Sequence, residues 1–211
     1  MAARQILSES QDREDSLNID TPSSAPATLI DLLTTRASAI KLVEPGPSEE
    51  QLASILKAAV SAADHGRLRP WRFVVIRGDG RRRFGDLLAR VQQDADPAAS
   101  ETQLESARAK AMRAPVIIAL LCEADPASKV PVIEQQFAAA AAGAHLMLSA
   151  KALGFGSNWK TGSAAYHPIV REGLGCGRDG SIIGFFYIGT EPKPSPLARA
   201  PIESVVRHWS D

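Results

Sequence analysis

The sequence has few cysteines and no excess of charge, and each shortage narrows the range of functions. Lys plus Arg and Asp plus Glu both total 24, so no net charge favours nucleic acid or an anionic membrane surface. The two cysteines, Cys122 and Cys176, lack CxxC spacing, and no signal-peptide pattern precedes them. A reduced, cytoplasmic protein fits this usage best. We expect a small molecule or another protein as partner, and no nucleic acid.

Several motifs that bind cofactors or carry out catalysis are also missing. No GxGxxG or GxxxxGK[ST] follows a strand pattern, which argues against a Rossmann site or a P-loop. No GxSxG nucleophile elbow is present. The four histidines lie far apart and lack the spacing of zinc ligands, so we predict no metal site: His65, His145, His167 and His208.

One run with little charge, residues 137–153, has to be compared with a membrane span. It reads FAAAAAGAHLMLSAKAL, consists mostly of Ala and includes His145 and Lys151. Burial of Ala gains little, so a buried helix is favoured over a transmembrane one. We expect no contact with a membrane.

Length and composition predict one domain. A chain of 211 residues that is 45% hydrophobic can bury one sizeable core. Residues 1–28 mix Ser, Asp, Glu, Gln and Pro without apolar periodicity, which predicts a disordered tail. Residues 29–211 are then the single domain.

The apolar periodicity predicts strands interspersed with longer helices. Ser48 and Gln51 form a capping box, which marks the most secure helix start. Further helices are expected at 29–36, around 84–91, and at 101–112, 131–153 and 168–175. Strands are expected at 72–77, 115–122, 156–159 and 181–190, and the second, continuously apolar, should be covered on both faces. The pattern predicts a layered α/β or α+β fold.

The first polar cluster is Arg36-Ala37-Ser38, where a predicted helix ends. A guanidinium offers forked donors and a hydroxyl adds one directional bond, a combination that suits a phosphate or a ribityl chain. The alternative is a helix C-terminus whose cations offset the helix dipole.

The second cluster is DHGRLRPW at residues 64–71, a loop between the capped helix and the first strand. Loops held by rigid elements concentrate functional groups, and His65 is the candidate here. The alternative is structural, with Asp64 capping a turn and Trp71 in the core.

The third cluster is GFGSNWKTG at residues 154–162, after the longest helix. Glycines let the backbone approach a planar ligand, and Trp159 can lie along a ring. Lys160 would place positive charge near a flavin and stabilise its anionic reduced form. The alternative is a strand end with a half-buried Trp.

Taken together, these clusters resemble the nitroreductase-like flavoproteins, most closely their short, single-domain NAD(P)H nitroreductases. The resemblance covers residues 29–190 and rests on RASAIKLVEPGPSEEQL, AADHGRLRPWRFVVI, GDGRRRF, RAPVII, GFGSNWKTG, VREGLGC and IIGFFYIGT, in that order. It implies an α+β sandwich with a central, mainly antiparallel sheet flanked by helices. It also implies a homodimer with FMN at the subunit interface.

The resemblance assigns roles to particular residues. Arg36 and Ser38 would hold the ribityl phosphate. Trp159, Lys160 and Thr161 would line the isoalloxazine ring, with a backbone N–H near Thr161 facing flavin N5.

The same resemblance places His65 against the flavin of the partner subunit and the Ala-rich helix in the dimer core. The nicotinamide would approach the open flavin face near residues 149–154.

The sequence departs from the family pattern at three positions. Ala37 stands where a second Arg is common, so we expect phosphate binding either to be weaker or to recruit Lys41 or Lys193. Ser61 stands where a close relative has an Arg, and Arg69 replaces the usual Gln before Pro-Trp.

The predicted function is an FMN-dependent NAD(P)H oxidoreductase that reduces an electron-poor acceptor, such as a nitroaromatic or a quinone, by ping-pong turnover. No catalytic side chain is expected, because the flavin carries the chemistry. The alternatives are a non-enzymatic flavin-binding protein, a flavin-dependent desaturase or dehalogenase on the same scaffold, and an interaction domain without flavin. No motif chooses between NADH and NADPH.

Overall fold

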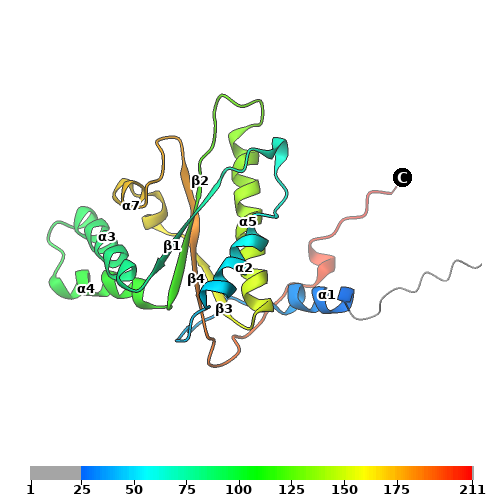
Figure 1. Cartoon of the computed structure of the whole chain (residues 1–211), viewed down its shortest axis with the longest axis horizontal. Coiled ribbons are helices and arrows are strands. Elements are labelled where there is room, and N and C mark those ends of the chain that lie inside the picture. The colour runs from blue at the N-terminus through cyan, green and yellow to red at the C-terminus, as the bar shows by residue number, and fades with distance from the viewer. Residues whose placement is uncertain (1–24, 211) are drawn as a thin grey trace, which may run out of the picture.

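The computed structural model describes residues 25–210, and its centre is a four-stranded sheet between two layers of helices (Figure 1). The strand order is β1-β2-β4-β3, and every neighbouring pair is antiparallel. The strands are β1 (Trp71–Arg77), β2 (Val116–Cys122), β3 (Gly156–Lys160) and β4 (Ser181–Gly189). The predicted α+β class is confirmed, with a sheet that is antiparallel throughout.

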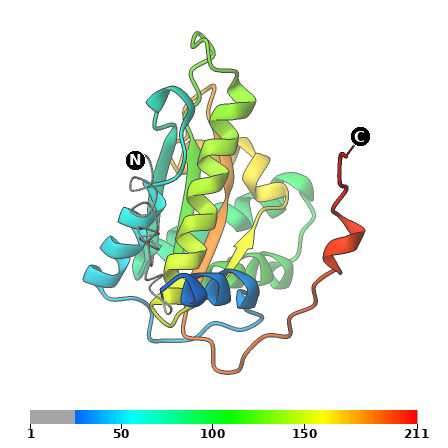
Figure 2. The same ribbon diagram turned by 90° about the vertical axis from the view of Figure 1, so that its right-hand side faces the viewer.

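One helical layer contains the longest helix, and the other contains several shorter ones. The first layer holds α2 (Glu49–Ala59) and α5 (Val132–Ala152), with α1 (Ala25–Thr35) at the C-terminal end of α5 (Figure 2). The second holds α3 (Asp79–Ala95), α4 (Glu101–Ala109), α6 (Ser163–Tyr166) and α7 (Pro168–Gly173). Three 3-10 turns complete the chain: η1 (His65–Arg67), η2 (Lys110–Met112) and η3 (Ile202–Ser204).

The burial of strand β2 shows that the sheet is covered on both faces. All its residues are buried, since alternate side chains enter the two hydrophobic clusters on either side. This confirms the burial predicted from its continuous apolar run.

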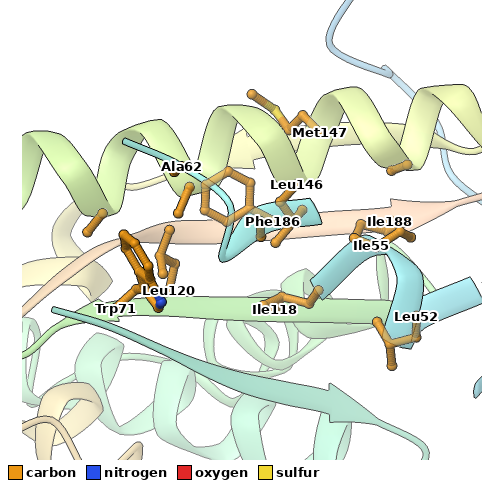
Figure 3. Packing of buried hydrophobic residues seen from close by; sticks show 14 of the residues in the cluster. Leu52, Ile55, Ala62, Trp71, Ile118, Leu120, Leu146, Met147, Phe186 and Ile188 are labelled. Atoms are coloured by element: carbon orange, nitrogen blue, oxygen red, sulfur yellow. The ribbon is translucent and has the colours of Figure 1, made fainter. Parts of the chain in front are cut away.

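The small side chains of α5 allow the helix to lie close to the sheet. Phe186 of β4 projects toward α5 beside Leu146 (Figure 3). A Cβ on Gly143 would lie 2.5 Å from Phe186 Cζ, closer than atoms can pack. The small residues buried within one chain include Ala138, Ala139, Ala142, Gly143 and Ala150. Packing inside the subunit therefore accounts for much of the Ala-rich pattern that the resemblance assigned to a dimer core.

Several predicted boundaries differ from the structure. Helix α1 begins at Ala25, whereas the pattern predicted a start near residue 29; the rest of the predicted tail lies outside the described residues. The helix expected at 101–112 divides into α4 and η2, and α6 lies where a loop was expected. The capping box of Ser48 and Gln51 is confirmed, with both reciprocal hydrogen bonds present. Within residues 25–210, no helix has the length and hydropathy that a membrane span requires.

Candidate functional site

Strand β3 is an edge strand with a cavity at each end. The Arg36 pocket, of about 90 Å³, is lined at the start of β3 by Gly156 and Ser157. The Lys160 pocket, of about 230 Å³, is lined at the other end by Lys160, Thr161 and Gly162. Residues 157 and 161 are about 13 Å apart at the rise of a strand. The two pockets therefore flank one short stretch of extended backbone.

The segment after α1 is fixed to the free edge of β3. Ala39 donates its backbone N–H to Ser157 O at 2.9 Å, and Asn158 Nδ2 donates to Ala39 O at 2.8 Å. These bonds place Arg36 at the first pocket. Ser38, which lies between Arg36 and Ala39 in the sequence, is exposed. The structure thus brings together two of the clusters that the sequence singled out.

The C-terminal segment closes this pocket from the other side. Ile40 N–H donates to Ser195 Oγ at 2.9 Å, and Arg199 Nη2 donates to Arg36 O at 2.7 Å. Ser195 and Glu191 line the pocket, and the Glu191 carboxylate accepts from Ser195 N at 3.1 Å. Part of the hydrogen-bonding capacity of the only acid in the lining is therefore already used.

Arg36, which lines this pocket, has an unsatisfied donor. Its Nη1 is buried and has no hydrogen-bond partner among the described residues. A buried, unpaired guanidinium N–H costs free energy unless a ligand accepts from it. Lys151, in the last turn of α5, also lines the pocket and donates from Nζ to Thr35 O at 3.0 Å. Arg36 and Lys151 together suit a phosphate or another small anion.

Lys151 is a residue whose role the sequence did not predict. Sequence reasoning named Lys41 and Lys193 as substitutes for the missing second Arg, but both are exposed and neither lines the pocket. The sequence signal that could have identified Lys151 is its position, as a cation in the last turn of the long helix just before the third cluster.

At the other end of β3, the side chains of the neighbouring residues Trp159 and Lys160 point to opposite faces of the sheet. The Trp159 indole packs on Phe186, with ring centroids 4.8 Å apart, and Nε1 donates to Ile183 O at 3.2 Å. Trp159 is thus a partly buried core residue, and the side chain of Lys160 turns to the opposite face because strand side chains alternate.

The Lys160 pocket is rich in cations. Lys160, Lys110 and Arg113 line it, and no carboxylate does. Lys110 and Arg113 come from η2 and the residue after it. Burial raises the pKa of Tyr187 to about 12, although Arg113 lowers it, so the phenol stays neutral at physiological pH. The pocket offers donors and positive charge beside apolar side chains, which favours a ligand that carries negative charge.

A glycine on β4 makes the position of Trp159 testable. A Cβ on Gly184 would overlap the Trp159 indole, so Gly184→Ala must displace this ring. We expect the free energy of unfolding to fall by about 3 kcal/mol, as for other overpacked cores. Thermal unfolding and near-UV circular dichroism of the variant would measure it. An unchanged melting temperature and tryptophan spectrum would contradict the packing described.

His65 lies far from the Arg36 pocket of its own chain. Its Nδ1 lies 2.5 Å from Oε2 of Glu134, in the first turn of α5, whereas Lys151 is in the last turn. Residues 134 and 151 are about 26 Å apart along the helix, at 1.5 Å per residue. One subunit alone therefore does not unite His65 with Arg36.

Other types of site are not formed by the described residues. No group of three or more His, Cys, Asp or Glu residues between positions 25 and 210 is arranged to hold a metal ion. Cys122 and Cys176 are both free, and burial raises the pKa of each thiol, to about 11 for Cys122. High thiol pKa values disfavour reactive thiolates.

Comparison with known proteins identifies consistent relatives. Residues 35–190 match the model of the nitroreductase family. The chain is 41% identical over 162 residues to "Putative NAD(P)H nitroreductase YdjA" of Escherichia coli K12, covering 76% of this chain and 87% of that protein.

Solved structures share the fold. A nitroreductase-like family protein from Bacillus cereus superposes with a TM-score of 0.74 at 24% identity, over 87% of this chain and 96% of its own. A nitroreductase from Desulfovibrio desulfuricans, solved in complex with FMN, gives a TM-score of 0.67 at 22% identity, over 87% and 97% of the two chains.

Proposed function

Because the chain belongs to the nitroreductase family, we propose that it is an FMN-dependent oxidoreductase that passes hydride from NAD(P)H to an electron-poor acceptor. The observation that carries the proposal is the pair of cavities along β3, one with an unpaired guanidinium and the other with three cations. The names of the relatives supply the cofactors: one was solved with FMN, and another is named for NAD(P)H.

The Arg36 pocket fits the phosphate of FMN. Arg36 Nη1 is the unsatisfied donor, Lys151 adds a second charge, and Ser38 lies on the same segment. A dianionic phosphate would satisfy the guanidinium and offset the cost of its burial. Lys151 thus takes the place that the family's second Arg would fill.

The Lys160 pocket fits the isoalloxazine ring. FMN, when bound, supplies the group that accepts hydride from the nicotinamide and donates it to the acceptor. Lys160, Lys110 and Arg113 would stabilise negative charge in the cavity, and the neutral Tyr187 phenol can donate a hydrogen bond. In this proposal Trp159 contributes its backbone and supports the strand from behind, while Thr161 borders the ring.

A homodimer is part of the proposal, and the surface of α5 supports it. Ile133 and Phe137 are 51% and 63% exposed on one face of α5, and α1 adds Leu29 and Ile30, each 56% exposed. Ile133 and Phe137 lie near the N-terminal end of α5 and α1 lies at its C-terminal end, so exposed apolar side chains occur along the length of the helix, as an interaction surface across it would require. A twofold axis across α5 would set two copies of the helix antiparallel and bring His65 of one subunit toward the Arg36 end of the other. In such a dimer, His65 lies far from Arg36 of its own chain because it belongs to the site of the other subunit.

The absorption spectrum of the protein as purified tests the cofactor. We expect a flavin spectrum, bleaching by NADH or NADPH under anaerobic conditions, and reoxidation by a nitroaromatic or quinone. Ping-pong turnover would give parallel lines in double-reciprocal plots. A colourless protein that takes up no FMN would contradict the proposal.

The alternatives give different results in the same experiment. Bleaching without reoxidation by any nitroaromatic or quinone would instead favour a desaturase, a dehalogenase or a non-enzymatic flavoprotein. The proposed setting is a reduced cytoplasm, supported by the two free thiols.

A further inference from the structure

The loop that carries His65 has an unusually constrained backbone. Gly66, Arg67 and Arg69 all have positive φ, of 75°, 56° and 49°. Such values are uncommon for residues with side chains, and they persist where surrounding contacts fix the chain. One contact is the Asp64 carboxylate, whose Oδ2 accepts from Arg69 N–H at 2.7 Å. The backbone next to His65 is therefore held by contacts within its own loop.

Glu134 determines which ring nitrogen of His65 carries the proton. A carboxylate can only accept, so a hydrogen bond from Nδ1 at 2.5 Å requires the proton to sit on Nδ1. Glu134 lies in the first turn of α5, where the helix dipole favours a carboxylate. Nε2 is left free for another contact, and the His65 side chain is 66% exposed.

The surroundings of this pair resemble an uncovered interface. Leu68, Ile133 and Phe137 are exposed apolar side chains on the same loop and helix turn. A partner that covered them would also shield the hydrogen bond between His65 and Glu134 from water and strengthen it. The only charged group within hydrogen-bonding range of His65 among the described residues is Glu134.

We propose that Glu134 is a positioning residue that holds the His65 imidazole with Nδ1 protonated, so that Nε2 contacts FMN bound by a second copy of the chain. This inference rests on the proposed function. It adds a residue from a different element, 69 positions along the chain from the histidine. The carboxylate acts on the cofactor only through the ring it orients, as carboxylates do behind histidines that ligate metals.

The test is Glu134→Gln, studied in the FMN-loaded dimer. A neutral amide can accept from Nδ1–H or donate to Nδ1, so it no longer holds the proton on Nδ1 as a carboxylate does. We expect the ¹⁵N signals of the His65 ring to change from the Nδ1–H to the Nε2–H pattern, and the Kd for FMN to rise roughly tenfold. Glu50→Gln is the control, because Glu50 also lies in the first turn of a helix and its side chain has no partner among the described residues. It should change neither reading.

A double-mutant cycle with His65→Ala separates positioning from a general effect on the fold. If Glu134 acts through the ring, Glu134→Gln should not weaken FMN binding further once His65 is removed. An equal loss of FMN affinity from Glu134→Gln in both backgrounds would overturn the inference and leave the proposed FMN binding standing. A wild-type protein that takes up no FMN would overturn the proposed function, and the role of Glu134 with it.

Discussion

Arg36→Ala is expected to weaken FMN binding about a hundredfold, which corresponds to ~3 kcal/mol. The reason is the buried Nη1, which has no partner within the described part of the chain and would donate to the phosphate. The same substitution should not destabilise the flavin-free protein, because it removes a donor that is buried without compensation. Loss of cofactor with an unchanged or higher melting temperature of the apoprotein is thus a signature specific to this arrangement. Flavin absorbance after dialysis, fluorescence titration and thermal unfolding measure it.

Two further variants test whether the loss of FMN binding is specific to Arg36. Lys151→Ala should weaken FMN binding less, because its ammonium already donates to Thr35 O and acts mainly as a charge. Arg83→Ala removes an exposed cation of α3 that lines neither pocket, and it should have no effect. Retention of FMN by Arg36→Ala at wild-type affinity would show that the phosphate lies elsewhere.

The sequence predicts best what depends on near neighbours. The Ser48 capping box spans three residues, and the apolar run of β2 carries its own burial signal, so both appear in the structure as expected. Helix α6 was missed because four residues, SAAY, are too few to show a period.

The cavity walls could not be predicted, because they form only when the sheet does. Lys110 and Arg113 reach the end of β3 because η2 leads into β2, which pairs with β4, which in turn pairs with β3. Lys151 meets Arg36 because α5 returns across the sheet to α1. Neither set of contacts corresponds to a recognisable residue spacing in the sequence. A resemblance to a family transfers only the roles of residues that are already known in relatives. Sequence reasoning therefore identified one side of each cavity.

Phe137→Glu is expected to convert the dimer into a monomer without FMN. In a single chain the ring is 63% exposed, so a glutamate there should cost the subunit little. At a twofold interface the same change buries a carboxylate on both sides, and an uncompensated buried charge costs about 3–5 kcal/mol. The Kd of the dimer should rise by more than about a thousandfold. Sedimentation velocity combined with flavin absorbance measures both mass and cofactor.

The control distinguishes an interface from general loss of solubility or stability. Met112→Glu places the same charge at a 49% exposed apolar position on η2, which packs against α3 and α4 of the second helical layer. That variant should remain dimeric. If Phe137→Glu were a folded monomer that still bound FMN tightly, each subunit would build the site alone, and His65 would have no role in it. If it were a dimer with FMN, the apolar face of α5 would not be the interface. A folded, colourless monomer is the outcome that follows from His65 and Arg36 lying at opposite ends of one helix.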